Sequence, residues 1–95
     1  MEEARRYVQE RQRILDRVRE VLVEATRLPQ APEDIDPDTP LFGTGLALDS
    51  IDALELVIAI EHAFDVTLAD EGGPALALRT VNTVVDRVMA RREAA

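Results

Sequence analysis

Apolar residues recur at helical spacing in three parts of the chain. Between about residues 3 and 27 they follow one another at intervals of one and three, which is typical of an amphipathic helix with one buried stripe. The stripe consists of Ile14, Leu15, Val18, Val21, Leu22 and Ala25. Pro29 predicts that this helix ends just before it. Residues 1–12 contain few large apolar groups, so we expect a helical extension that projects or frays, and a folded domain over residues 13–92.

A second helix is predicted from Asp49 or Ser50 to about Phe64, and a further main helix after Thr80, whose side chain can cap it. The expected buried faces are formed by Ile51, Leu54, Val57, Ile58 and Phe64 in the former, and by Val81, Val84, Val85 and Val88 in the latter. Pro74 suits the first position of a short helix over residues 74–78. Because no stretch alternates as a strand does, the predicted fold is an all-α, four-helix bundle with three main helices and one short helix.

The segment between the first two helices, residues 28–49, is rich in proline, glycine and acidic residues and has no helical periodicity. A loop of this length within a small domain needs anchors of its own. The expected anchors are Leu41, Phe42, Leu46 and Leu48. Asp36 and Asp38 have the spacing of the first ligands of a calcium loop, but Leu41 stands where such a loop requires glycine, so we exclude that site.

The net charge of −8 is concentrated in the middle of the 95-residue chain. Residues 28–78 contain eleven acidic residues and no basic one, which argues against nucleic-acid binding and favours a basic partner or an ion. The chain has no cysteine, so disulfides and thiolate metal sites are excluded. The longest apolar run, Leu56–Ile60, is too short to span a membrane, and the first residues do not resemble a secretory signal, so we expect a cytoplasmic protein.

The stretch 45–56 has the sequence GLALDSIDALEL and places Ser50, the only serine, at the start of a predicted helix. The plain interpretation is a helix N-terminus in which Asp49 is the N-cap, Asp52 is the capping-box acid and Ser50 is a small first-turn residue. A catalytic triad is excluded because His62, twelve residues further along the same helix, would lie about 18 Å from Ser50.

At this stretch the sequence resembles the acyl carrier proteins and the related carrier domains of polyketide and peptide synthases. In that family an Asp-Ser-Leu motif opens the second of four helices, and residues 49–52 match it with Ile51 in place of leucine. The resemblance extends over residues 13–90. It implies a four-helix fold and a 4′-phosphopantetheine group, which a phosphopantetheinyl transferase takes from coenzyme A with magnesium and attaches to Ser50, beside Asp49.

The resemblance also implies a substrate carrier and not an enzyme, namely a discrete acyl carrier protein of a fatty-acid, polyketide or secondary-metabolite pathway. Two alternatives stay open: a peptidyl or aminoacyl carrier, and a helical interaction module in which Ser50 is only a helix-cap residue. The stretch is similar to that of free-standing carriers of aryl polyene and dialkylresorcinol biosynthesis. It departs from the family at Ala47, where glycine is frequent.

A carrier needs a surface that several enzymes can bind and then leave, and the residues around Ser50 suit this task. The predicted docking residues are Leu48, Ile51, Asp52, Leu54, Glu55 and Glu61. Their carboxylates would attract acyltransferase- or ketosynthase-type enzymes with basic patches. The apolar members could instead belong to the core, and we favour that interpretation for Ile51. We expect the protein to act as a monomer.

Overall fold

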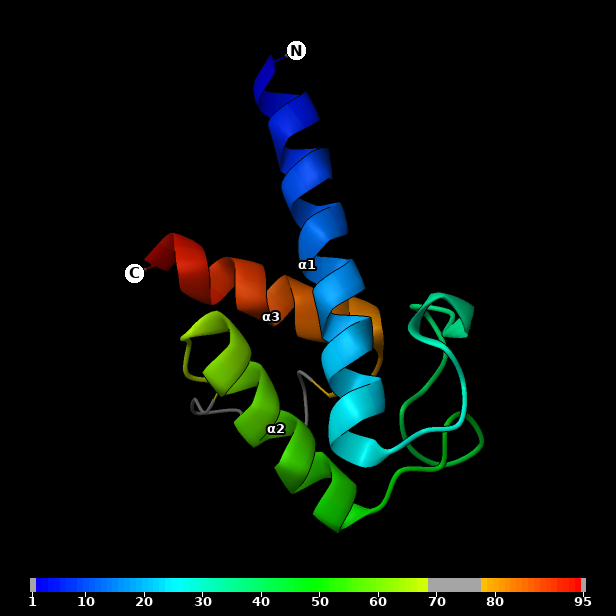
Figure 1. Cartoon of the computed structure of the whole chain (residues 1–95). Helices are drawn as coiled ribbons and strands as arrows, with labels where there is room; N and C mark the ends of the chain where they lie inside the picture. Colours follow the sequence, from blue (N-terminus) through cyan, green and yellow to red (C-terminus); the bar gives the residue numbers. More distant parts are fainter. Residues whose placement is uncertain (1, 69–77, 95) are drawn as a thin grey trace.

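The computed structural model describes residues 2–68 and 78–94, which form three α-helices and one 3₁₀ helix. Their bounds are α1 Glu2–Thr26, η1 Pro32–Asp34, α2 Ser50–Phe64 and α3 Val81–Ala94. Figure 1 shows α2 and α3 packed against α1, whose N-terminal half extends beyond them. The predicted all-α fold is confirmed for the described residues. The short helix predicted over residues 74–78 lies outside them.

The apolar stripes predicted for α1 and α3 form most of the core. Ile14, Val18, Val21 and Leu22 of α1 are buried, and the predicted valines of α3 are completely buried. Burial of these side chains is the main favourable term that holds the two helices together. Within residues 2–68 and 78–94, no helix is long and apolar enough to cross a membrane.

α2 buries a different face from the predicted one. Its buried residues are Leu56 and Ile60, and of the predicted face only Val57 and Phe64 pack against the core, both partly buried. The exposed members of the predicted face are Ile51, Leu54 and Ile58. The prediction that Ile51 belongs to the core is therefore wrong. Apolar residues surround this part of the helix, so periodicity alone does not select the face that packs.

The long loop before α2 is anchored by apolar side chains, as predicted. Leu41 and Leu48 are buried, while Phe42 and Leu46 are partly buried against the core. Ile35, which we did not predict, is a further buried anchor. It stands alone among acidic residues, so no periodic pattern marks it.

Backbone hydrogen bonds tie the same loop to the start of α3. The Leu41 N–H donates to the carbonyl oxygen of Arg79 at 2.9 Å, and the Asn82 N–H donates to that of Pro37 at 3.0 Å. Thr80 caps α3 as predicted, because its hydroxyl accepts a hydrogen bond from a backbone N–H in the first turn. The loop is therefore held at the N-terminal end of α3 before it reaches α2.

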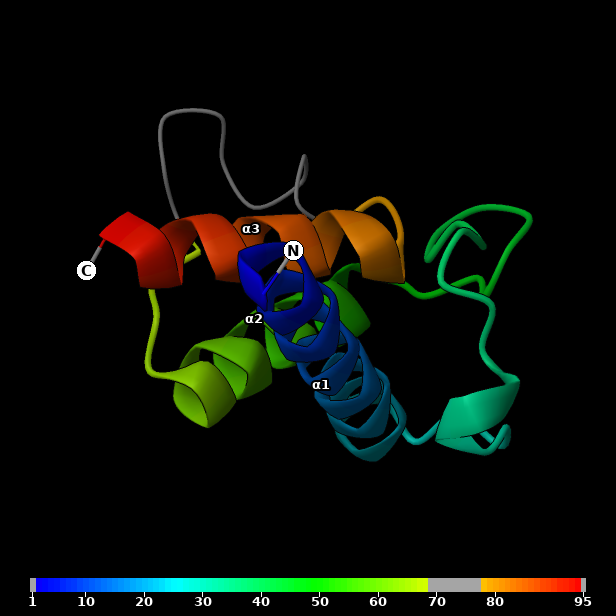
Figure 2. The same ribbon diagram turned by 90° about the horizontal axis from the view of Figure 1, so that it is seen from above.

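The N-terminal segment, residues 2–12, is a regular continuation of α1 and projects from the bundle (Figure 1). Seen from above in Figure 2, the N-terminal end of α1 lies in front of α2 and α3. It is helical and does not fray. Two ion pairs connect its base to α3. Arg11 lies 2.8 Å from the carboxylate of Asp86, and Arg92 lies 3.2 Å from that of Glu10.

Candidate functional site

Ser50 is the first residue of α2 and is exposed. Leu48, two residues earlier, is 7% exposed, and its N–H donates to the carbonyl oxygen of Leu41 at 2.9 Å. Ala47, the residue before Leu48, adopts a left-handed backbone conformation with φ of 58°. A buried anchor and a sharp turn thus deliver Ser50 to the surface at the start of a helix.

Asp49 and Asp52 close the N-terminus of α2 as the predicted capping box. The Asp49 carboxylate accepts a hydrogen bond from the Asp52 N–H at 2.8 Å, and the Asp52 carboxylate accepts one from the Asp49 N–H at 3.0 Å. Within the part of the chain that the structure describes, the Ser50 hydroxyl forms no hydrogen bond. The helix-cap role considered for Ser50 therefore belongs to Asp49.

The start of α2 also fits a phosphate ester on Ser50. The backbone N–H groups of Ser50 and Ile51 have no acceptor among residues 2–68 and 78–94, because the two carboxylates of the capping box bind other amides. Free amides at a helix N-terminus, together with the positive end of the helix dipole, favour an anion. The carboxylates nearby offset part of this attraction. The phosphodiester of a 4′-phosphopantetheine group would meet two unused donors here.

An exposed apolar stripe runs along α2 beside the serine. Ile51, Leu54 and Ile58 are 67%, 61% and 58% exposed, and their spacing of three and four places them on one face. Ser50 borders this stripe, because it lies one helical turn before Leu54. Glu55 is exposed between Ile51 and Ile58 on the adjoining face. Ile58 was missed as a docking candidate, although the same spacing could have found it.

Two predicted docking residues are used by the fold. Leu48 packs in the core and offers little surface to a partner. The Glu61 carboxylate accepts a hydrogen bond from the Leu68 N–H at 2.8 Å, so it supports the chain that follows α2. The exposed part of the predicted docking surface consists of Ile51, Leu54 and Glu55, with Asp52 partly buried at its edge.

The fold and the site define a small helical protein whose long loop presents one exposed serine at the start of a helix. The phosphopantetheine attachment site family matches residues 16–88. Over 64 residues the chain is 38% identical to a protein named acyl carrier protein from Sulfurovum sp. (strain NBC37-1), which covers 67% of this chain and 81% of that relative. The chain belongs to the acyl carrier protein family, and its cofactor is covalently attached 4′-phosphopantetheine.

Proposed function

We propose that the chain holds acyl groups as thioesters on a 4′-phosphopantetheine arm attached to Ser50 and presents them to biosynthetic enzymes. The proposal rests on the exposed Ser50 hydroxyl, which is unused within the described residues at a helix start that Asp49 already caps. When bound, the group supplies a flexible arm with a terminal thiol for the acyl group. The name of the Sulfurovum relative favours acyl over peptidyl cargo.

The chain's own residues bind and orient, and the acyl chemistry belongs to its partner enzymes. Ser50 offers the hydroxyl that a phosphopantetheinyl transferase esterifies. The capping box fixes the first turn of α2, so the hydroxyl keeps its place while Ile51 and its neighbours face the transferase. In this role the protein is a substrate of each partner and not an enzyme.

The docking surface that we assign consists of the exposed stripe Ile51, Leu54 and Ile58 together with Glu55. Its apolar side chains would pack against transferases and acyltransferase- or ketosynthase-type enzymes, and its negative charge would speed encounter with basic patches on them. Because the surface is small and partly charged, partners can bind and leave, as a shuttle requires.

The attachment site is tested by replacing Ser50. The Ser50→Ala protein, incubated with coenzyme A, magnesium and a broad-specificity transferase, should gain no mass, whereas the parent gains one phosphopantetheine group. Thr44→Ala is the matched control, since Thr44 carries an exposed hydroxyl in the same loop and its loss should leave the mass gain intact. Circular dichroism should show equal helix content in all three proteins. A mass gain in Ser50→Ala would overturn the assignment.

The cargo separates acyl from peptidyl carriers. Protein purified from its own host should release a fatty or polyketide acyl group when its thioester is cleaved, and mass spectrometry of that group identifies it. An amino acid or peptide in its place would establish the alternative and contradict the proposed cargo, while leaving the Ser50 attachment intact.

A further inference from the structure

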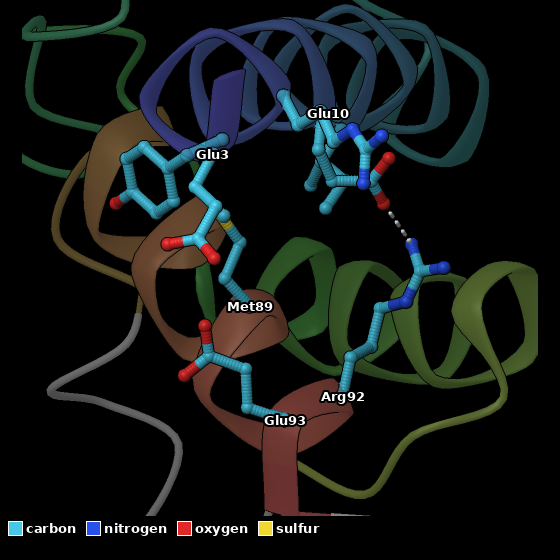
Figure 3. A pocket seen from close by; sticks show the side chains of 8 residues that line it. Glu3, Glu10, Met89, Arg92 and Glu93 are labelled. Carbon is cyan, nitrogen blue, oxygen red and sulfur yellow. Dashed lines mark ion pairs between the residues drawn. The ribbon is translucent and has the colours of Figure 1, made fainter. Parts of the chain in front are cut away.

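The projecting half of α1 leaves a groove between its base and the end of α3. Figure 3 shows this groove, with Glu3 and Glu10 above it and Met89, Arg92 and Glu93 along its other side. Tyr7 lines the groove and is 52% exposed, although most large apolar side chains of the described residues are buried. An exposed aromatic side chain at the mouth of a groove is a feature of interaction surfaces.

The charges on this face of α1 alternate in sign. Glu3, Arg6, Glu10 and Arg13 follow at intervals of three, four and three, which places them on one side of the helix. The resulting order is acid, base, acid, base over about 15 Å of helix. When a second copy of this helix runs in the opposite direction, each acid of one helix lies opposite a base of the other.

In place of the monomer expected from the sequence, we infer a dimer in which this face binds the same face of a second copy of the chain, with the two helices antiparallel. An antiparallel pair whose two-fold axis passes midway between Arg6 and Glu10 sets Glu3 opposite Arg13 of the partner subunit, and Arg6 opposite Glu10 of the partner subunit. The two-fold axis repeats each pair, so four attractive contacts form. A parallel pair would set each of these charges opposite its own copy and would be repelled.

The charges needed for this contact are available in the isolated chain. Glu10 lies 2.6 Å from Arg13 and 3.2 Å from Arg92. Arg6 lies 4.0 Å from Glu2. Because these side chains are exposed or partly exposed, their ion pairs are weak enough to exchange partners. A hydrogen bond from Arg13, with the positive charges of Arg13 and Arg92, holds the pKa of Glu10 below its usual range. Glu10 is therefore charged at neutral pH and can attract a basic side chain of a second copy.

The size of the contact predicts a weak dimer. A helical face of twelve residues spans about 18 Å, and even with Tyr7 and Met89 in the groove the contact falls at the low end of specific interfaces. The association should therefore depend on protein concentration and weaken with salt, because exposed ion pairs provide its specificity.

Sedimentation equilibrium tests the dimer in the unmodified chain, without any reference to the carrier function. Between about 10 µM and about 1 mM protein at low salt, the weight-average mass should rise from that of the monomer towards that of the dimer. Added salt should reverse the rise. A monomer over the whole range would overturn the proposal and leave the groove to a different protein.

Two charge reversals test the antiparallel geometry. Glu3→Arg sets arginine opposite Arg13 of the partner subunit, and Arg13→Glu sets glutamate opposite Glu3 of the partner subunit. The dimer affinity of each variant alone should therefore fall at least about tenfold. Mixed in equal amounts, the two variants should regain the association of the parent, because both opposed pairs are again attractive.

Arg5→Glu is the matched control, since Arg5 lies about 100° around the helix from Arg6 and off the proposed face. It makes the same change in charge as Arg13→Glu and should leave the dimer intact. Circular dichroism verifies that all variants stay helical. Dimerisation of either reversed variant at the strength of the parent, or a mixture that stays monomeric, would overturn the proposed contact.

Discussion

Ala47 bears the backbone strain of the turn that leads to Ser50. Its φ of 58° is left-handed, a conformation that costs a residue with a side chain about 1–2 kcal/mol. Glycine adopts this conformation without that penalty, which gives a physical reason for its frequency at the corresponding position of the carrier proteins that the sequence resembles. This chain makes the same left-handed turn with alanine in place of glycine.

Ala47→Gly should therefore stabilise the protein by about 0.5–1 kcal/mol, because relief of the strain exceeds the added freedom of the unfolded chain. Urea unfolding measures the change. Ala90→Gly is the control, since Ala90 is exposed within α3 and its loss should cost about 1 kcal/mol. If both substitutions destabilise equally, Ala47 is not strained.

Gly45 is required by a close contact and not by its backbone angles. A Cβ atom on Gly45 would lie 1.8 Å from the carbonyl oxygen of Pro40, which accepts a hydrogen bond from the Leu46 N–H at 2.9 Å. Gly45→Ala should cost about 3 kcal/mol of unfolding free energy.

Gly43 provides the comparison for that substitution. Its φ is 69°, but no heavy atom lies within 4 Å of an added Cβ, so Gly43→Ala should cost only about 1–2 kcal/mol. Urea unfolding of both variants gives the order. Equal losses would show that the loop moves away from Pro40 and that the contact does not constrain it.

At the scale of the element, local chemistry predicted where α2 lies but not how it packs. Asp49 and Asp52 mark its start through side-chain bonds to neighbouring amides, so a few residues suffice to predict it. Which face is buried depends chiefly on α1, against which α2 packs and which is distant in sequence. Leu56 and Ile60 face the core while Leu54 faces solvent, although all three are equally apolar.

The same limit applies to the contacts of the N-terminal segment. Arg11 pairs with Asp86 and donates a hydrogen bond to Asn82 at 3.3 Å, and no local pattern connects positions so far apart in the chain. The sequence places the segment outside the folded domain because it contains few large apolar residues. The part of the segment next to α3 contributes polar contacts in place of apolar ones.

Truncation separates the two parts of this segment. Removal of residues 1–9 should change the melting temperature little. Removal of residues 1–12 should cost about 1 kcal/mol, or about 4–8 °C, because the ion pairs of both Glu10 and Arg11 with α3 are lost. Thermal unfolding at a dilute concentration measures both. In the full chain, Asp86→Ala should reproduce the part of the larger loss that is due to Arg11. Equal melting temperatures for the two truncations would show that the contacts of Glu10 and Arg11 with α3 do not contribute.

Across the whole molecule, acids and bases are arranged unequally. Within the described residues, the ion pairs use acids of α1 and α3, and none uses an acid from residues 28–68. The negative charge around the loop and α2 is therefore not neutralised by neighbouring arginines. Such a field reaches about one Debye length into solution and attracts basic partners towards the serine.

Glu55 is the acid with which to test this attraction. Reversal of Asp52 would also break the capping box, so its effect on partners could not be separated from its effect on α2. Glu55→Arg should lower the rate of phosphopantetheine transfer on the order of threefold to tenfold at low salt, and the difference should shrink as salt rises. Its stability should be unchanged, because Glu55 is exposed.

Two further variants assign the effect of Glu55. Glu33→Arg makes the same change in charge on η1, away from α2, and should slow transfer much less. Leu54→Ala should slow transfer at every salt concentration, since apolar contacts are not screened. If Glu33→Arg and Glu55→Arg slow transfer equally, partners respond to net charge alone. If neither slows transfer and Leu54→Ala does, recognition rests on the exposed stripe, and the acids around it are a solvated surface.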